Sequence, residues 1–283
     1  MFFQPTTVLE VKDLLADYKN AKLLAGGTDL LLEIKRDKIN PKYLIDISHV
    51  DSLKEITDGE DEITIGSMVT FSQLLENPLI KTHFHSLIEC AKGMGSPQIR
   101  NMATIGGNII NAQAAADSIP CIMSLDGVLV IESQKGIRKV SCESYFEYYS
   151  QERIKDDEIL TKVILPKSNG LTGFYKLGKR NSLAIARMIT SIYLSVENEI
   201  IKEIALCLGA VGKFPFRVKE IEREAIGKRI DWLYSEEPLN LLENSVYESI
   251  KERKSMPFKK EAIKGVYKAA LKNVGWEDDR SDN

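Results

Sequence analysis

The chain has 283 residues, 43% of them hydrophobic and 28% charged, which is enough for one large or two medium-sized domains with buried cores. The formal net charge is −3, from 38 basic and 41 acidic residues, so the composition offers no electrostatic basis for binding nucleic acid. No apolar segment approaches the roughly 18 residues that a membrane helix requires, and the first residues lack the basic and apolar regions of a signal peptide. We therefore expect a soluble, cytoplasmic protein of the α/β type.

The cysteines and histidines are spaced too widely for most metal centres. The chain contains four cysteines, each at least about twenty residues from the next: Cys90, Cys121, Cys142 and Cys207. Such spacing is typical neither of a disulfide framework nor of a CxxC metal or iron–sulfur site. His83 and His85 flank Phe84, but a zinc site requires more ligands at better spacing. We therefore expect no metal ligands in this chain.

The first 75 residues show alternating patterns of helix and strand. Thr7 and Glu10 have the spacing of a capping box, and apolar residues follow at helical intervals as far as Tyr18. The predicted strands are 21–25, 43–47 and 62–66, and the predicted short helices are 29–36 and 71–75. The alternation over the first 47 residues favours an α/β layer over a β-sandwich.

Residues 93–120 are unusually rich in Gly, Asn, Ala and Ser, carry little charge and show no sustained period. We expect a long irregular loop here, and such loops within a compact domain are usually functional or disordered. Its isoleucines, Ile99, Ile105, Ile109 and Ile110, favour burial over disorder. Buried irregular backbone needs hydrogen-bonding partners, and a polar ligand would supply them.

The second half of the chain is predicted to contain strands first and helices afterwards. A helix at 119–125, a hairpin of 128–132 with 137–140, and a strand at 159–165 precede the polar, turn-forming segment 166–170, which we interpret as a domain boundary. Beyond it we expect strands at 173–177, 189–197 and 201–208. Helices are expected at about 217–227, 239–253 and 259–272. This grouping predicts an α+β second domain.

Two glycine pairs are the strongest candidates for ligand binding. Gly26-Gly27 follows a predicted strand and precedes a predicted helix, and Gly106-Gly107 lies in the segment 93–120. Glycine permits close approach of another group, and successive backbone N–H groups in such a turn form an anion-binding concavity. Two such turns meeting in space would hold a pyrophosphate, although each pair alone could be an ordinary tight turn. Neither pair has the GxGxxG or GxxxxGK[ST] pattern, so a Rossmann or P-loop fold is not predicted.

The sequences around both pairs resemble the two FAD-binding loops of the flavin subunits of molybdenum hydroxylases, the xanthine dehydrogenase and carbon monoxide dehydrogenase type. The first loop corresponds to 24–30 (LAGGTDL) and the second to 103–109 (ATIGGNI), followed by Asp117. Further matching motifs keep the family's order over roughly residues 1–270: Phe3, Pro5, Ile65-Gly66, Thr70, 98–101, 174–176, Arg180, Ile185-Ala186, 208–211 and 215–217.

The resemblance implies an α+β architecture. It predicts an α/β-type FAD-binding domain of the PCMH type at 1–167, with lobes at about 1–55 and 56–167. A smaller α+β flavoprotein domain with an antiparallel sheet and helices would follow at 171–275, and a polar tail at 276–283.

The resemblance also assigns FAD-binding roles to individual residues. The first loop would wrap the pyrophosphate through the following residues: Leu23, Leu24, Ala25, Gly26, Gly27, Thr28, Asp29 and Leu30. The second loop would contribute Thr104, Gly106, Gly107, Asn108 and Asn111, with Asp117 as a later acidic contact. Met94 and Gly95 would lie near the adenine-bearing half of the cofactor. Lys176, Arg180 and Arg187 are basic candidates, and Tyr175 could pack near the isoalloxazine.

Several of these roles have simpler alternatives. Asp117 could accept hydrogen bonds from ribose hydroxyl or backbone N–H groups, or it could cap a helix that begins at Ser118. Lys176 and Arg180 could belong to a solvated basic surface, and Tyr175 could be a core aromatic.

The resemblance implies an oxidoreductase subunit that carries electrons from iron–sulfur clusters through FAD to NAD or another acceptor. The flavin would supply the chemistry, so we expect no catalytic residues. The chain has neither the cysteines for [2Fe–2S] clusters nor the length for a molybdenum domain, so iron–sulfur and molybdopterin subunits are the expected partners. The alternatives are a stand-alone flavin reductase or oxidase of the same fold and a nucleotide-binding scaffold without redox activity. The substrate, whether a purine, an aromatic acid or carbon monoxide, would be selected on the molybdenum subunit.

Overall fold

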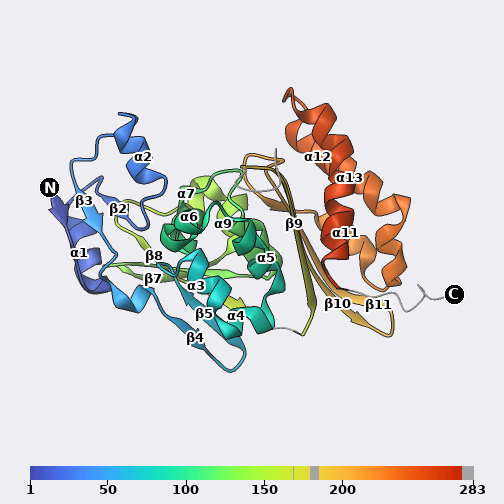
Figure 1. The fold of residues 1–283 in the computed structure, drawn as a ribbon, viewed down its shortest axis with the longest axis horizontal. Helices are drawn as coiled ribbons and strands as arrows, with labels where there is room; N and C mark the ends of the chain where they lie inside the picture. The colour runs from blue at the N-terminus through green and yellow to red at the C-terminus, as the bar shows by residue number, and fades with distance from the viewer. Residues whose placement is uncertain (168, 179–184, 276–283) are drawn as a thin grey trace. The chain divides into compact units, whose positions relative to one another are not determined.

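The computed structural model describes residues 1–167, 169–178 and 185–275, and these form two compact units (Figure 1). Unit 1 consists of Met1–Leu79, Met94–Ala112 and Asp126–Lys167, and unit 2 consists of Ile80–Gly93, Gln113–Leu125 and the described residues beyond 168. The chain therefore passes between the units several times before the segment 166–170. The predicted domain ranges stay predictions, and Ser168, Arg180 and the tail at 276–283 lie outside the described residues.

The N-terminal part of unit 1 is a small parallel sheet with the strand order β1-β3-β2. Its elements are β1 (Phe2–Phe3), α1 (Val8–Asp17), β2 (Lys22–Leu24), α2 (Leu30–Lys35) and β3 (Leu44–Asp46). The predicted capping box of α1 is confirmed, because the backbone N–H of Glu10 donates to Thr7 Oγ1 at 3.2 Å. The buried side chains Val11 and Leu15 share one apolar cluster with Ile45. The predicted α/β layer is therefore present in this part.

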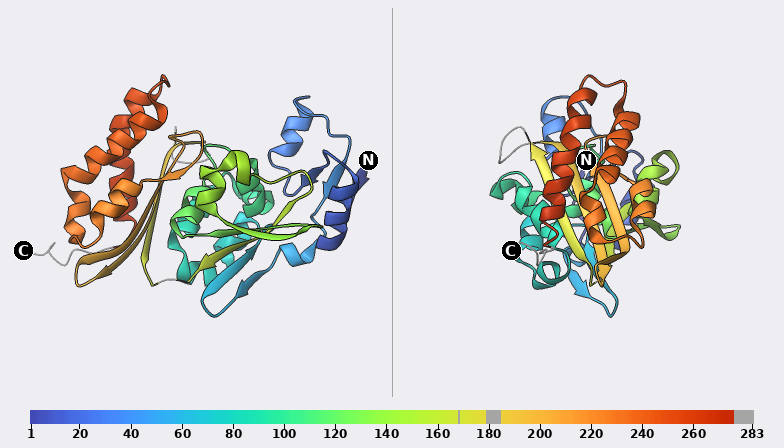
Figure 2. Two further views of the ribbon diagram at one scale, coloured as in Figure 1. Left: turned by 180° about the vertical axis from the view of Figure 1, so that it is seen from behind. Right: turned by 90° about the vertical axis from the view of Figure 1, so that its right-hand side faces the viewer.

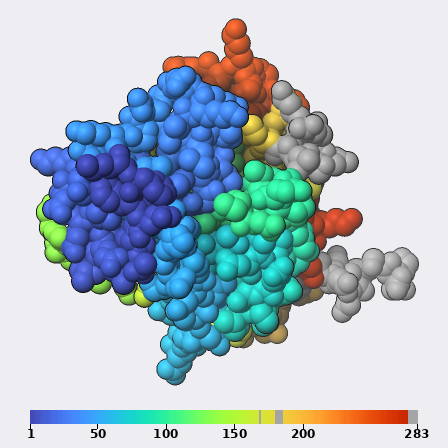
Figure 3. Space-filling view, turned by 60° about the vertical axis from the view of Figure 1, so that its left-hand side comes forward, coloured from blue at the N-terminus to red at the C-terminus, as the bar shows by residue number. Residues whose placement is uncertain are grey.

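The rest of unit 1 is built on a five-stranded antiparallel sheet with the strand order β4-β5-β8-β6-β7. Its strands are β4 (Ile56–Asp58), β5 (Glu62–Gly66), β6 (Val128–Ser133), β7 (Gly136–Ser141) and β8 (Ile159–Pro166). Its helices are η1 (Asp51–Leu53), α3 (Phe71–Glu76), α6 (Pro97–Met102), α7 (Ile105–Asn111), α9 (Cys142–Glu147) and α10 (Tyr149–Glu152). The predicted hairpin and the strand at 159–165 are confirmed. In the space-filling view, the dark blue N-terminal residues and the lighter blue residues that follow them lie next to each other on the face shown (Figure 3).

The expectation of a long irregular loop at 93–120 is wrong. The segment folds into α6, α7 and α8 (Ser118–Ser124), of which the last belongs to unit 2. The side-chain oxygen of Ser96 caps α6 and accepts a hydrogen bond from the N–H of Ile99, while Thr104 caps α7. Each helix is only about two turns long, so no hydrophobic period persists long enough to be recognised in the sequence.

Unit 2 is an antiparallel sheet with the strand order β12-β11-β10-β9, and helices cover both faces (Figures 1 and 2). The strands are β9 (Leu171–Gly178), β10 (Ala186–Glu197), β11 (Ile200–Gly209) and β12 (Phe216–Arg217). α11 (Lys219–Ala225), η2 (Ile230–Tyr234), α12 (Glu236–Ile250) and α13 (Met256–Lys272) lie on one face, with α5 (His85–Gly93) and α8 on the other. The short α4 (Pro78–His83) precedes α5. The predicted α+β character of this part is confirmed.

The two-sided cover explains the burial pattern of β10, in which residues 188–192 are all buried, polar and apolar alike. Met188 and Ile192 belong to the apolar cluster formed with α11, α12 and α13. Ser191 points to the opposite face, where its hydroxyl hydrogen-bonds that of Ser124 on α8 at 2.8 Å. A strand that is buried on both faces loses the alternation of polar and apolar residues.

The described residues contain neither a membrane-spanning helix nor a cluster of metal-binding side chains. Within that part of the chain, no helix combines the length and the apolar character needed to cross a membrane. The same residues contain no group of three or more His, Cys, Asp or Glu side chains placed to hold a metal ion.

Candidate functional site

The first glycine pair lies between β2 and α2 and tolerates no side chain. A Cβ atom on Gly26 would lie 1.7 Å from the carbonyl oxygen of Met102, at the end of α6. Gly27 has a φ of +69°, in the left-handed region that disfavours other residues. Both glycines are therefore required by the fold of unit 1, the first by close packing and the second by its backbone conformation.

The backbone N–H groups of this loop are available to a ligand. Those of Gly26, Gly27, Thr28 and Asp29 donate to no acceptor within residues 1–167, 169–178 and 185–275. Asp29 occupies the N-cap position of α2 but makes no capping hydrogen bond with its side chain. Four consecutive N–H groups without an acceptor, next to a glycine with positive φ, form the kind of concavity that binds anions.

The second glycine pair is arranged differently from the turn that the sequence suggested. Gly106 and Gly107 lie in the first turn of α7, and their N–H groups donate to Ser67 O at 2.9 Å and to Thr104 Oγ1 at 3.1 Å. A Cβ atom on Gly106 would lie 2.6 Å from that of Ser67. The argument from open N–H groups therefore applies to the first loop and not to the second, where the glycines permit close packing.

The two loops lie side by side although 80 residues separate them in the sequence. Gly26 packs on Met102, and the place of a Cβ atom on Gly107 is 4.0 Å from that of Ala25. The side-chain amide of Asn111 donates to a carboxylate oxygen of Asp29 at 2.9 Å. These three contacts join the first loop to α6 and α7 and fix its backbone for a ligand.

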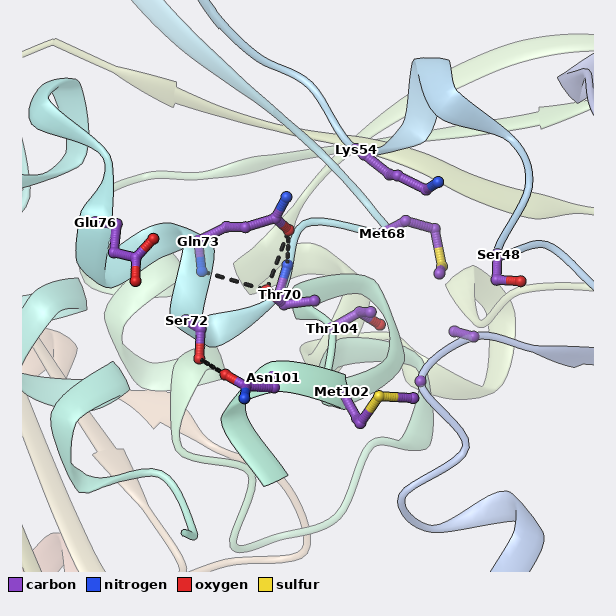
Figure 4. Close-up of a pocket in the computed structure, with 12 residues that line it drawn as sticks. Ser48, Lys54, Met68, Thr70, Ser72, Gln73, Glu76, Asn101, Met102 and Thr104 are labelled. Carbon is purple, nitrogen blue, oxygen red and sulfur yellow. Dashed lines mark hydrogen bonds between the residues drawn. The ribbon is translucent and has the colours of Figure 1, made fainter. Parts of the chain in front are cut away.

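A pocket of about 440 Å³ opens beside the loops in unit 1 (Figure 4). Its wall is formed by the first loop, α3, α6 and nearby residues: Ala25, Gly26, Ser48, Lys54, Met68, Thr70, Ser72, Gln73, Glu76, Asn101, Met102 and Thr104. Figure 4 shows Thr70 hydrogen-bonded to Gln73, and Ser72 to Asn101. The volume lies within the range of small-molecule sites. Most of these residues were not predicted, because their positions carry no binding motif in the sequence.

Asp117 and Lys176 form a buried ion pair in unit 2. Lys176 Nζ donates to the Asp117 carboxylate and to the carbonyl oxygen of Gly93, the latter at 3.1 Å. The two side chains are only 12% and 4% exposed, so Lys176 does not belong to a solvated surface. Asp117 precedes α8 but does not cap it with its side chain. Burial raises the pKa of Asp117 to about 6, although the charge and hydrogen bond of Lys176 act in the opposite direction.

The remaining predicted residues are spread over both units. Met94 and Gly95 precede α6, and their carbonyl oxygens accept hydrogen bonds from Arg100 at 3.1 and 3.2 Å. In unit 2, the Arg187 guanidinium lies 5.4 Å from the centre of the Phe258 ring. Tyr175 on β9 is 36% exposed and is therefore not a core aromatic. The other predicted residues occupy the two loops or their flanks: Leu23 and Leu24 in β2, Thr28, Leu30 at the start of α2, and Asn108 in α7.

Known protein families match nearly the whole chain. The family model described as the FAD binding domain in molybdopterin dehydrogenase matches residues 1–168, and the CO dehydrogenase flavoprotein C-terminal domain matches residues 173–274. The chain is 34% identical to the nicotinate dehydrogenase FAD-subunit of Eubacterium barkeri, over 96% of this chain and 95% of that one. It is 31% identical to a putative xanthine dehydrogenase FAD-binding subunit of Escherichia coli K12, over 92% and 89% of the two chains.

A solved structure agrees with these sequence matches. It is the carbon monoxide dehydrogenase of Hydrogenophaga pseudoflava that lacks the Mo-pyranopterin moiety of the molybdenum cofactor. The TM-score is 0.87 and the sequence identity 25%, with 96% of each chain covered. The similarity thus extends over the residues of both units.

Proposed function

Since this chain belongs to the family of FAD-binding subunits of molybdopterin dehydrogenases, we propose that it passes electrons from an iron–sulfur partner through FAD to NAD or another acceptor. It is an oxidoreductase subunit of the molybdenum hydroxylase family, and its cofactor is FAD. FAD supplies the redox chemistry when bound, because its isoalloxazine ring takes up and releases electrons. The chain's own residues therefore bind and orient the cofactor.

The first glycine loop is the observation that supports the position of the cofactor. FAD carries a negatively charged diphosphate, and the loop offers four N–H groups with no acceptor among the described residues. We infer that the backbone of residues 23–30 binds this diphosphate, with the loop held in place by Met102 and Asn111. Thr104 and Asn108 on the adjacent helix would add side-chain contacts, while the missing side chains of Gly106 and Gly107 allow close packing.

Further contacts would come from outside the two loops. We propose that Asp117 accepts a hydrogen bond from a hydroxyl group of the cofactor, and that Met94 and Gly95 contact its adenine-bearing half. Lys176 is buried and already bonded to Asp117. Arg187 lies over the Phe258 ring, so it is a weaker candidate for a cofactor contact.

The partners follow from what these 283 residues lack. They contain no cysteines at the spacing of an iron–sulfur site, so the cluster would be held by a separate subunit, and the molybdopterin by another. The similar proteins are named for nicotinate, xanthine and carbon monoxide, so their names do not agree on one substrate. We propose that the substrate is selected on the molybdopterin subunit.

Anaerobic reduction of the purified chain tests this proposal. NADH should bleach the flavin absorbance if NAD is the physiological acceptor, because electron transfer between the two cofactors is reversible. Xanthine without partner subunits should leave the flavin oxidised, since the reaction with substrate would occur on the molybdenum centre. Bleaching by xanthine alone would overturn the role as an electron-transfer subunit. Failure of NADH alone would exclude NAD as the acceptor.

A further inference from the structure

The side chain of Lys176 connects three segments of unit 2 that lie far apart in the sequence. It extends from β9, and its amine donates to the carboxylate of Asp117 just before α8 and to the carbonyl oxygen of Gly93 at the end of α5. Asp117 is itself a proposed cofactor contact, and Gly93 is followed directly by Met94, which is another. A single amine thus sets the positions of two segments next to the proposed FAD contacts.

One atom of this ion pair has no hydrogen-bonding partner. The carboxylate oxygen Oδ1 of Asp117 is buried and receives no hydrogen bond within the described residues. Burying two ions is favourable only when further hydrogen bonds satisfy their remaining donors and acceptors. An unsatisfied oxygen on a side chain that is 4% exposed therefore indicates that a donor outside the described residues completes the site.

We propose that Lys176 is a positioning residue for FAD: it holds the ionised carboxylate of Asp117 with Oδ1 free to accept a hydrogen bond from a hydroxyl group of the cofactor. This inference rests on the proposed function, because it takes FAD to be the ligand. It gives Lys176 a role that acts through Asp117 and does not require its amine to touch FAD. Charge-assisted hydrogen bonds of this kind are roughly twice as strong as neutral ones, so the ionised state of Asp117 matters for affinity.

The surroundings of Asp117 predict how FAD binding changes with pH. Among the described residues, the titratable groups that face it are Lys176 on β9 and the thiols of Cys90 on α5 and Cys121 on α8. Burial raises the pKa of the Cys90 thiol well above its ordinary value, so this thiol stays neutral near pH 7. Burial also raises the pKa of Asp117 to about 6, and Lys176 keeps it from rising further. FAD affinity should therefore fall as the pH drops through about 6, where Asp117 takes up a proton.

Five variants of the full chain, one of them the Lys176→Met/Asp117→Asn double variant, separate positioning from general stability. Lys176→Met removes the cation, Lys176→Arg keeps it, and Asp117→Asn removes the titration with little change in volume. Arg217→Met is the matched control, because Arg217 and Glu222 form another buried pair in unit 2, at 2.8 Å and 10% and 9% exposure. The measurements are the FAD dissociation constant of each apo-protein from about pH 5 to pH 8, together with its melting temperature.

We expect Lys176→Met to weaken FAD binding at pH 7 by at least about tenfold, or about 1.4 kcal/mol. Its loss of affinity should begin at a higher pH than in the wild type, because the pKa of Asp117 rises without the cation. Lys176→Arg should restore much of the affinity, and Asp117→Asn should bind weakly with no pH dependence. The double variant should bind no more weakly than Asp117→Asn alone, since both changes remove one interaction. Arg217→Met should lose stability and keep the wild-type pH profile.

Specific outcomes would overturn this inference. Wild-type affinity and pH profile in Lys176→Met would exclude the positioning role, as would effects of Lys176→Met and Asp117→Asn that simply add. If Lys176→Met does not fold, a pH-independent wild type or an Asp117→Asn variant with unchanged affinity would also refute it. A wild-type chain that binds no FAD would instead refute the proposed function, so the two failures are distinguishable.

Discussion

Replacing Gly26 with alanine should force the two glycine loops apart and prevent FAD binding. The new Cβ atom would lie 1.7 Å from the Met102 carbonyl oxygen and 2.5 Å from its carbon, whereas real Cβ atoms essentially never come within 3.0 Å of such atoms. The loops would have to separate by the difference, 3.0 minus 1.7, or at least 1.3 Å. Both obstructing atoms belong to the backbone, so no side-chain rotation relieves the contact.

The size of the effect follows from the cost of overpacking. Inserting a methyl group into a closely packed site typically costs about 1–3 kcal/mol, and a clash with backbone atoms belongs at the upper end. For a domain of about 150–250 residues, about 3 kcal/mol corresponds to a decrease in melting temperature of roughly 6–12 °C. The displaced loop would also lose the alignment of its four open N–H groups, so flavin content should fall well below one per chain.

Thermal unfolding and flavin absorbance, measured on the same preparations, check this prediction. Gly265→Ala is the matched control, because Gly265 lies within α13 and a Cβ atom there would meet nothing within 4 Å. That variant should be stabilised by up to about 1 kcal/mol through helix propensity and should bind FAD normally. A Gly26→Ala protein with the melting temperature and flavin content of the wild type would refute the role that we assign to the Gly26–Met102 contact.

Three further predictions concern the cofactor and the stability of unit 1. Gly107→Val should leave the circular dichroism spectrum native but strongly reduce flavin content. The Cβ atom of the valine would lie 2.9 Å from Thr104 Oγ1, which caps α7, and the valine side chain would obstruct a phosphate. Normal flavin occupancy in the folded variant would contradict this. Acid precipitation should release the flavin as FAD, since neither loop contains a cysteine or histidine for covalent attachment; flavin left in the pellet, or FMN in the supernatant, would be the opposite result. Glu158→Gln should destabilise the protein at pH 7 by about 1.5–3 kcal/mol, because Glu158 accepts two hydrogen bonds from Arg138 at 2.9 and 3.0 Å. Burial raises the pKa of Glu158, but the bonds from Arg138 and the Lys155 backbone outweigh it and keep the pKa below its ordinary value of 4.5. The stabilisation is thus present above about pH 4.5 and is lost as the pH falls, so the difference between variant and wild type in urea unfolding should shrink on acidification; a constant difference would count against this ion pair.

Local signals in the sequence were sufficient to predict much of the secondary structure. The capping box of Thr7 and Glu10 marks the start of α1, and both hydrogen bonds of the box are formed. The hairpin of β6 and β7 and the long strands of unit 2 were also predicted, because each strand pairs with a neighbour in the sequence. The order of short motifs along the chain identified the family, since such motifs depend on residue type and spacing and not on three-dimensional contacts.

The arrangement of the cofactor loops depended on contacts between distant residues. Gly26 was predicted to be needed for a turn, but a Cβ atom there would meet the carbonyl oxygen of Met102. Every residue has a carbonyl oxygen, so the residue type at position 102 does not reveal this contact. The pair Gly106-Gly107 was predicted to offer N–H groups, but these are bonded to Ser67 and Thr104. The short helices α6 and α7 were missed because two turns are too few to establish a period.

The sequence by itself determined the secondary structure of most segments, the family and the identity of the cofactor, because residue type and spacing carry that information. Only the tertiary structure decided which polar groups remain open to a ligand. Lys176 and Asp117 are 59 residues apart, and nothing in their local sequences distinguishes a buried ion pair from two solvated charges. Whether the Asp117 carboxylate or the N–H groups of residues 26–29 find a partner depends on which segments fold around them. Hydrogen bonds and burial are satisfied by neighbours in space, and the folding of the whole unit sets those neighbours.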